Sequence, residues 1–326
     1  AEDKVSCPLH HDAKDNVASN FVQQKGDVVA AFKKAEHITK LRFTSGRHSG
    51  VPLETRGLIA NYDATQEKLK VWGPTKVTHF NRGVLAHMLD MEEHTIEMIE
   101  PDVGGGFGVR GEFYPEDYLI PYAALMLKRP VKWIEDRLEH LSASVSASNR
   151  TMTLRAAVEN DGRITALDWD QIEDVGAYLR APEPATIYRM HGNMCGAYDI
   201  ANLAIRNRVV MTNKTPTGLN RGFGGPQIYY ALERLMQRIA RELDIEPLDV
   251  IRCNLIPSRS FPYRTASGAV YDSGDYQHAL AVALKDGEYE SLLAKREAAR
   301  LQGRLYGIGL AAAIEPSVSN MGYLST

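Results

Sequence analysis

The sequence predicts a mixed fold of the α+β class, built of two α/β subdomains. Strand-like and helix-like periodicities are interspersed along the chain without the strict alternation that a doubly wound parallel sheet requires. Two glycine-rich stretches, DVGGGFGVRGE at 102–112 and NRGFGGPQ at 220–227, each lie between a strand-like and a helix-like segment. With 326 residues, 44% of them hydrophobic, the chain is long enough for more than one packed unit. We expect an extended lead-in at residues 1–20, a first subdomain at 21–150 with the GGGFG loop, and a second at 151–326 with the RGFGGPQ loop.

The elements of the first subdomain follow from apolar spacing. Residues 57–63 and 68–74 alternate in polarity on either side of a polar turn, a pattern typical of a β-hairpin. Apolar residues recur at helical spacing between Thr78 and Leu89, and the strand TIEMIEPDV then runs into the glycine stretch. The remaining predicted elements are a helix at 28–35, a strand at 41–48, a helix at 116–127 and the strand VKWIED.

The second subdomain is predicted in the same way. Residues 152–178 form a long two-stranded ribbon that turns at Asn160-Asp161-Gly162. The strand LAIRNRVVMTN precedes the second glycine stretch, and 227–243 is an apolar-periodic helix. Pro247 opens another helix, and Asp275 caps one more. Near the end of the sequence the apolar run GIGLAAAIEP is strand-like.

Composition excludes several classes of protein. The chain has 38 basic and 41 acidic residues and a net charge of -3, which argues against nucleic acid or an anionic membrane as a partner. Its three cysteines form no CxxC pair, so neither a disulfide framework nor a structural zinc site is predicted. Long apolar runs and a signal-peptide pattern are both missing. We expect a cytoplasmic protein.

The first glycine loop, residues 102–112, is compatible with an anion-binding loop before a helix. Its spacing lacks the third small residue of GxGxxG, and no GKS or GKT follows, so neither a Rossmann nor a Walker site is predicted. A tight turn that uses glycine for positive φ is the equally weighted alternative. The residues alone leave both interpretations open.

The second glycine loop, residues 220–227, has the same properties. Arg221 precedes a Gly-Phe-Gly-Gly run, and a long helix begins just after Pro226. The guanidinium of an arginine can pair with a phosphate or carboxylate, and the glycines free backbone donors beside it. Two such loops favour one large phosphorylated ligand held between them, although loop aromatics are often simple packing residues.

Three long motifs in order carry a family resemblance. They are EPDVGGGFGVRGEFYPEDYLIPYAALMLKRPVKWIEDRLEHL, TNKTPTGLNRGFGGPQIYYALERLMQRIARELDIEPLDVIRCNLI and FPYRTASGAVYDSGDYQHAL. They resemble the molybdenum-cofactor subunit of the xanthine dehydrogenase, aldehyde oxidase and aerobic carbon monoxide dehydrogenase family. The likeness runs from about Asp12 to about Tyr323 and corresponds to the first molybdenum-cofactor-binding domain of the large subunit.

The resemblance implies that both glycine loops bind one molybdenum-molybdopterin cofactor, without a protein side chain as metal ligand. The cofactor form with a cytosine dinucleotide is one possibility within the family. The implied cofactor-binding residues are Gly105, Gly106, Phe107 and Gly108 in the first loop, Arg221, Gly222, Phe223 and Gly224 in the second, and Lys76. Phe223 and Gly111 are the implied substrate-pocket residues.

Three positions depart from the family pattern. Lys76 stands where family members usually have a glutamine near the molybdenum oxo group. Gly111 stands where purine oxidases have a substrate-binding glutamate, which argues against purines. The copper-type carbon monoxide dehydrogenases need a cysteine in the second loop, and this sequence has glycine and phenylalanine there instead.

The implied function is hydroxylation of an aldehyde or N-heteroaromatic substrate with oxygen derived from water. The family's general base is a glutamate, expected beyond Thr326 or on a partner chain, so we expect the isolated chain to be inactive. The expected partners are a second half of the molybdenum subunit, an iron-sulfur subunit with 2Fe-2S centres and an FAD subunit. Because the chain starts at Ala1 without methionine and stops at NMGYLST, it is expected to be a split subunit or a fragment. The alternative is a degenerate, non-catalytic homologue that keeps the fold without a competent molybdenum site.

Overall fold

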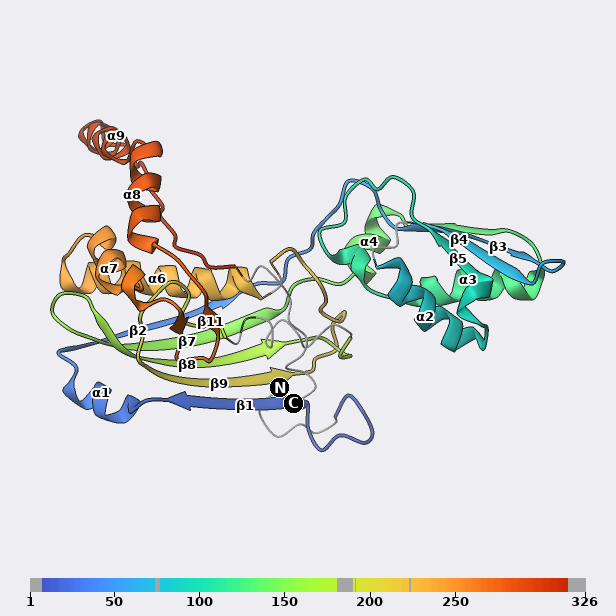
Figure 1. The fold of residues 1–326 in the computed structure, drawn as a ribbon, viewed down its shortest axis with the longest axis horizontal. Coiled ribbons are helices and arrows are strands. Elements are labelled where there is room, and N and C mark those ends of the chain that lie inside the picture. Colours follow the sequence, from blue (N-terminus) through green and yellow to red (C-terminus); the bar gives the residue numbers. More distant parts are fainter. Residues whose placement is uncertain (1–7, 74–76, 181–189, 191, 223, 316–326) are drawn as a thin grey trace.

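The computed structural model describes residues 8–73, 77–180, 190, 192–222 and 224–315. These residues form two lobes at opposite ends of an elongated molecule, each built on its own β-sheet (Figure 1). The smaller lobe holds a four-stranded sheet and the larger lobe a five-stranded sheet. The prediction of a mixed α+β fold is confirmed.

The small lobe pairs its strands in the order β5-β4-β3-β6. The antiparallel pair β3 and β4 confirms the predicted hairpin, and β5 runs parallel to β4. Helices α2 and α3 supply apolar side chains such as Leu85 and Ala124 to a core with Leu58 and Leu69 of the sheet. The bounds are β3 Gly57–Asp63, β4 Lys68–Trp72, α2 Thr78–Leu89, β5 Ile96–Ile99, α3 Pro115–Leu127 and β6 Val131–Ile134.

The large lobe has the strand order β1-β9-β8-β7-β2. The long antiparallel pair β7 and β8 confirms the predicted ribbon, and Gly162 turns it with a φ of +88°. Strand β9 then lies parallel to β8. The bounds are β1 Val17–Lys25, β2 His37–Ser45, β7 Asn149–Val158, β8 Ile164–Asp174 and β9 Asn202–Val210.

Strands from the start of the chain complete the large sheet. Strand β1 pairs antiparallel with β9, and β2 pairs antiparallel with β7. Residues 17–20, predicted to belong to a lead-in, are therefore part of a strand, and residues 21–25 and 37–45 lie in the sheet of the second predicted unit, with a helix between them. The large sheet therefore combines strands that precede the small sheet in sequence with strands from residue 149 onward. Pairing between strands so distant in sequence leaves no local periodicity from which it could be predicted.

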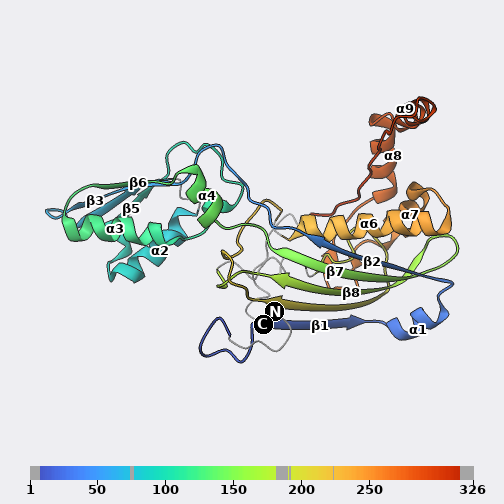
Figure 2. The same cartoon turned by 180° about the vertical axis from the view of Figure 1, so that it is seen from behind.

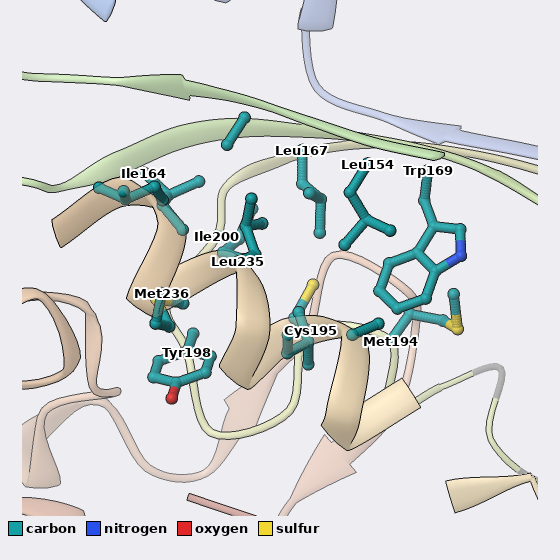
Figure 3. Close-up of a cluster of buried hydrophobic side chains, with 14 of the residues drawn as sticks. Leu154, Ile164, Leu167, Trp169, Met194, Cys195, Tyr198, Ile200, Leu235 and Met236 are labelled. Carbon is teal, nitrogen blue, oxygen red and sulfur yellow. The ribbon is translucent and has the colours of Figure 1, made fainter. Parts of the chain in front are cut away.

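The main core lies between the large sheet and helix α6, Gly225–Leu243. Alternate residues of the strands, such as Leu154, Leu167 and Trp169, point toward Leu235 and Met236 of the helix (Figure 3). Helix α7, Pro247–Asn254, follows α6 on the same side of the sheet (Figure 1). Fully burying one such side chain contributes about 1.5–3 kcal/mol, so this layer holds the second glycine loop on a rigid base.

The opposite face of the large sheet is covered at one end by α1, Val28–Lys34. Asp27 caps this helix by accepting a hydrogen bond from the Ala30 N–H at 2.9 Å. Val28 packs against Ala157 and Ala166, whose small side chains let the helix approach the strands. Both faces of the sheet are therefore apolar at this end.

Two regions differ from the sequence prediction. Helix α4, Arg137–Ala143, was not predicted, although Asp136 and Glu139 form a capping box with two bonds of 2.8 Å. The run GIGLAAAIEP is wrong as a strand prediction, because the described residues 307–315 pair with no strand. The side chains of Asn193, at 3.2 Å, and Tyr229 donate instead to the Ile314 carbonyl.

Helices α8, Tyr276–Asp286, and α9, Tyr289–Leu301, project from the large lobe (Figures 1 and 2). Neither helix contains a buried residue, and Leu301 is 90% exposed. The two-residue strands β10, Tyr263–Arg264, and β11, Val270–Tyr271, form a small hairpin before them. In the part of the chain that the structure describes, none of the helices has the length and apolar character needed to cross a membrane.

Candidate functional site

The two glycine loops meet in space. The first loop connects β5 to α3, and the second connects β9 to α6. The Arg221 N–H donates a hydrogen bond of 2.9 Å to the Phe107 carbonyl oxygen, which joins the loops directly. A Cβ built on Gly108 would lie 2.8 Å from both the carbonyl carbon and oxygen of Leu219, so only glycine permits this approach. The loops therefore form one continuous surface at the junction of the lobes.

Backbone strain marks the first loop. Phe107 has a φ of +51°, in the left-handed region that non-glycine residues rarely adopt. Its ring is 45% exposed, so burial of the ring does not account for the conformation. Such strain, of about 1–3 kcal/mol, is typical of residues whose geometry serves a function.

A buried arginine anchors the first loop to the chain between the lobes. Arg110 lies 3.0 Å from the Glu54 carboxylate and also donates to the Thr55 carbonyl at 2.6 Å. The same carboxylate accepts the Gly104 N–H at 2.6 Å. Burial lowers the pKa of Arg110, against the opposing effect of Glu54, and the charged pair fixes the base of the loop.

A second buried arginine anchors the second loop to the large sheet. Arg150 on β7 pairs with Glu173 on β8 at 2.8 Å, and both side chains are fully buried. Arg150 also donates to the Gly224 carbonyl at 3.3 Å. Asn220 donates to the His48 carbonyl at 2.9 Å, which ties the start of the loop to the chain between the lobes.

A small pocket lies beside the second loop. Its walls include His48, Ser148, Asn220, Gly224 and Gln227. Ser148 Oγ and Gln227 Oε1 are buried here without a hydrogen-bond partner among the described residues. Unsatisfied buried polar atoms are costly, and the N-terminus of the 19-residue helix α6 opens at the same place. The crevice has no room for a water molecule, so these polar atoms lie directly behind the second loop and the start of α6.

The side chain of Glu112, at the end of the first loop, contacts the backbone just before the second loop. Its buried carboxylate accepts the Leu219 N–H through Oε1, and Arg180 Nε lies 3.4 Å from Oε2. A Cβ on Gly218 would lie 1.8 Å from Oε1, so the carboxylate sits directly on the glycine. Burial raises the pKa of Glu112 to about 7, and Arg180 and the Leu219 N–H oppose this rise.

The family of molybdopterin cofactor-binding domains matches residues 9–255, well over half of the chain. The chain belongs to this family, as a cofactor-binding domain of the molybdenum hydroxylases. It is 34% identical over 313 residues to the nicotine 6-hydroxylase large subunit of Paenarthrobacter nicotinovorans, covering 95% of this chain and 38% of that protein. It is 35% identical over 274 residues to the carbon monoxide dehydrogenase large chain of Afipia carboxidovorans, covering 82% of this chain and 34% of that one.

The solved structures agree with these relatives. Quinoline 2-oxidoreductase from Pseudomonas putida 86 superposes with a TM-score of 0.83 at 32% identity, over 89% of this chain and 37% of that chain. The molybdenum hydroxylase domain described here therefore spans 38% or less of the length of each of these proteins. The resemblance inferred from the three sequence motifs is confirmed.

The structure brings together most of the predicted site residues of this molybdenum hydroxylase domain. In the first loop Gly105, Gly106 and Gly108 are half-buried. In the second loop Gly224 is buried, and the Arg221 side chain is exposed. Gly111 is buried in a 3-10 turn, where its N–H donates to the Gly108 carbonyl at 2.8 Å. Lys76 and Phe223 lie outside the described residues.

Sequence reasoning missed the residues that support the loops. Buried Arg110 pairs with the half-exposed Glu54, and Arg150 forms a fully buried pair with Glu173. Ser148 and Gln227 present polar atoms without a partner among the described residues. Gln227 stands in the quoted motif NRGFGGPQ, directly after the proline that opens α6, so its position was a usable signal. No local sequence pattern distinguishes a buried arginine from an exposed one. Arg110 and Arg150 therefore could not be identified from the sequence.

Proposed function

We propose that this chain is the molybdopterin-binding component of a multi-subunit molybdenum hydroxylase. The observation that carries the proposal is the Arg221–Phe107 backbone contact, which joins the two loops beside a pocket with unpartnered Ser148 and Gln227 atoms. The residues proposed to contact the cofactor are Gly105, Gly106, Phe107, Gly108, Arg221, Gly222, Phe223, Gly224 and Lys76. When bound, the cofactor supplies the redox chemistry.

The chain's own residues orient the ligand and exclude water. Phe107 presents an exposed ring at the loop junction, and the N-terminus of α6 favours a negatively charged group. Arg110 and Arg150 hold the two loops in place through buried charges. The site is thereby preorganised before a ligand arrives, which lowers the entropic cost of binding.

The proposed substrate is an N-heteroaromatic compound or an aldehyde, oxidised with oxygen derived from water. Relatives at 34% and 32% identity are named for nicotine and quinoline, two N-heteroaromatic compounds. Glu112 follows Gly111 but turns inward to Leu219, so it is not available for a purine at the position where purine oxidases have glutamate. Carbon monoxide is disfavoured, because the second loop has no cysteine to bridge copper.

The general-base glutamate is proposed to lie outside this chain. We propose a second molybdenum-subunit half, a 2Fe-2S subunit and an FAD subunit as partners, and a cytoplasmic location for the complex. A relative at 31% identity is named as the gamma subunit of a 6-hydroxypseudooxynicotine dehydrogenase complex, which supports a hetero-oligomer. The isolated chain is expected to be inactive, and the cofactor is proposed to be the cytosine dinucleotide form.

Metal and pterin analysis of the intact complex tests the proposal. The complex is purified through a tag on this chain, molybdenum is measured by mass spectrometry, and pterin by the fluorescence of its oxidised form. Molybdenum and pterin are expected in equal molar amounts. Gln227→Leu removes an unpartnered pocket atom and should lower both, while Gln237→Leu, on the outer side of the same helix, should change neither. A purified complex with its sister chain present but without molybdenum would refute the proposal.

The second candidate function is a non-catalytic homologue, which Lys76 favours. This lysine stands where the family resemblance implies a glutamine near the molybdenum oxo group. In a competent site, Lys76→Gln should preserve or raise molybdenum content and turnover. If the complex holds no cofactor with either residue, the non-catalytic function is supported instead.

A further inference from the structure

Glu112 links the small lobe to the backbone of Leu219, directly before the second glycine loop. Its side chain is fully buried, and it lies just after the turn that ends the first loop. Oε1 accepts the Leu219 N–H, and Leu219 is also the residue against which Gly108 packs. One carboxylate therefore contacts the backbone at the point where the loops are closest.

The other carboxylate oxygen faces a cation. Arg180 Nε lies 3.4 Å from Glu112 Oε2, and the same guanidinium donates to the Phe113 carbonyl and stacks 4.4 Å from the centre of the Tyr114 ring. Arg180 and the Leu219 N–H therefore contact different oxygens of the Glu112 carboxylate. A charged acceptor fixed in this way binds an N–H more strongly than a neutral one.

We infer that Glu112 is a positioning residue, which holds the second loop against the first through Leu219 and thereby controls how firmly the bound cofactor is retained. The inference rests on the proposed function, because it concerns retention of the cofactor assigned to that site. Glu112 itself lies beneath the loops and is assigned no contact with the cofactor. Its effect passes through the backbone of Leu219 to Arg221 and its bond with Phe107.

The carboxylate of Glu112 changes charge near neutral pH, which gives the inference a specific signature. Burial raises its pKa to about 7, opposed by Arg180 and the Leu219 N–H. Above that pH the anion accepts the Leu219 N–H with charge assistance, and below it the neutral acid does not. The titratable and charged groups that face Glu112, across its pocket or beside it, are Arg56, Arg110, Tyr114, Asp117 and Arg180.

Pterin release from the purified complex, measured at about pH 6 and about pH 8, tests the inference. In the wild type, release should be about fivefold faster at the lower pH, the effect of losing roughly one charge-assisted hydrogen bond. Glu112→Gln keeps the shape and an acceptor oxygen but cannot ionise. It should release pterin at one rate at both pH values, close to the wild-type rate at low pH.

The matched control is Glu116→Gln, in the same segment, whose carboxylate pairs with Arg56 at 3.2 Å and not with the second loop. This variant should keep the wild-type pH dependence. Amide exchange at Leu219, corrected for intrinsic rates, should rise in Glu112→Gln at the higher pH and stay unchanged in Glu116→Gln. This measurement needs no cofactor.

The outcomes separate the two proposals. A wild-type complex without pterin refutes the proposed function, while exchange at Leu219 still tests the role of Glu112. If Glu112→Gln retains the wild-type pH dependence of release, or leaves Leu219 exchange unchanged, the inference is overturned. A pH-independent release together with faster exchange supports it.

Discussion

The Arg221 N–H donates a 2.9 Å hydrogen bond to the Phe107 carbonyl oxygen. This contact makes the two glycine loops, one from each lobe, a single surface. Each loop is held by an ion pair of a buried arginine: Arg110 with the half-exposed Glu54 at the first loop, and Arg150 with the fully buried Glu173 at the second. Because the loops are bonded to each other, a shift of either loop would strain the ion pairs at both.

Gly108→Ala is expected to separate the loops. The new Cβ would lie 2.8 Å from the Leu219 carbonyl group, and Gly108 has a φ of +102° that alanine disfavours. We expect a loss of stability of at least about 1–3 kcal/mol from backbone strain, measured as a lower Tm of the complex. Gly106→Ala is the control, because its Cβ would meet its nearest neighbour only at 3.9 Å. Equal Tm values for the two variants would contradict the steric explanation.

Arg150→Met is expected to destabilise the large lobe. The substitution removes the buried partner of Glu173 at 2.8 Å and the bond to the Gly224 carbonyl. Breaking a buried pair costs about 3–5 kcal/mol, which denaturant unfolding can measure. Arg155→Met, on the same strand, removes a half-exposed arginine from its pair with Asp168 and should cost about 1 kcal/mol or less. If the two variants unfold alike, the Arg150 pair does not have this structural importance.

The stability of the chain should fall as pH rises through the neutral range, partly because of Glu233. Burial raises the pKa of Glu233 to about 7 from 4.5, while bonds from Tyr198 and Ala312 oppose the rise. The folded state binds the Glu233 proton more tightly than the unfolded state does. The stabilising contribution of this proton to the free energy of unfolding is therefore complete below pH 4.5 and is lost as pH rises to about 7. Tm measured between about pH 5 and about pH 8 should decline less steeply in Glu233→Gln than in the wild type. An unchanged slope would show that Glu233 is not responsible.

Leu154→Ala should destabilise the core between the large sheet and α6. Leu154 is fully buried beside Leu167 and Trp169 (Figure 3), so truncation leaves a cavity. Such substitutions cost about 2–5 kcal/mol. Leu138→Ala, at a side chain that is 76% exposed, should change the free energy of unfolding by less than about 0.5 kcal/mol. Similar losses for both would mean that this layer is not the main core.

The sequence predicted the local elements well because their signals are local. The hairpin of β3 and β4, the ribbon of β7 and β8 and the long helix α6 each follow a single apolar period, and all are confirmed. The capping box of Asp136 and Glu139 is a local signal for helix α4 that apolar spacing alone does not reveal. The apolar run at 307–315 was misassigned, because apolar character alone does not supply a partner strand.

The sequence by itself determined the family, the two glycine loops and the positions that depart from the family pattern. Only the tertiary structure decided that β1 and β2 complete the large sheet, and that Glu112 and Arg150 support the loops from beneath. The physical reason is the range of the interactions. Glycine content and apolar periodicity can be read from residues that are neighbours in the sequence. A buried charge becomes recognisable only when chain segments distant in sequence enclose it and supply its partner.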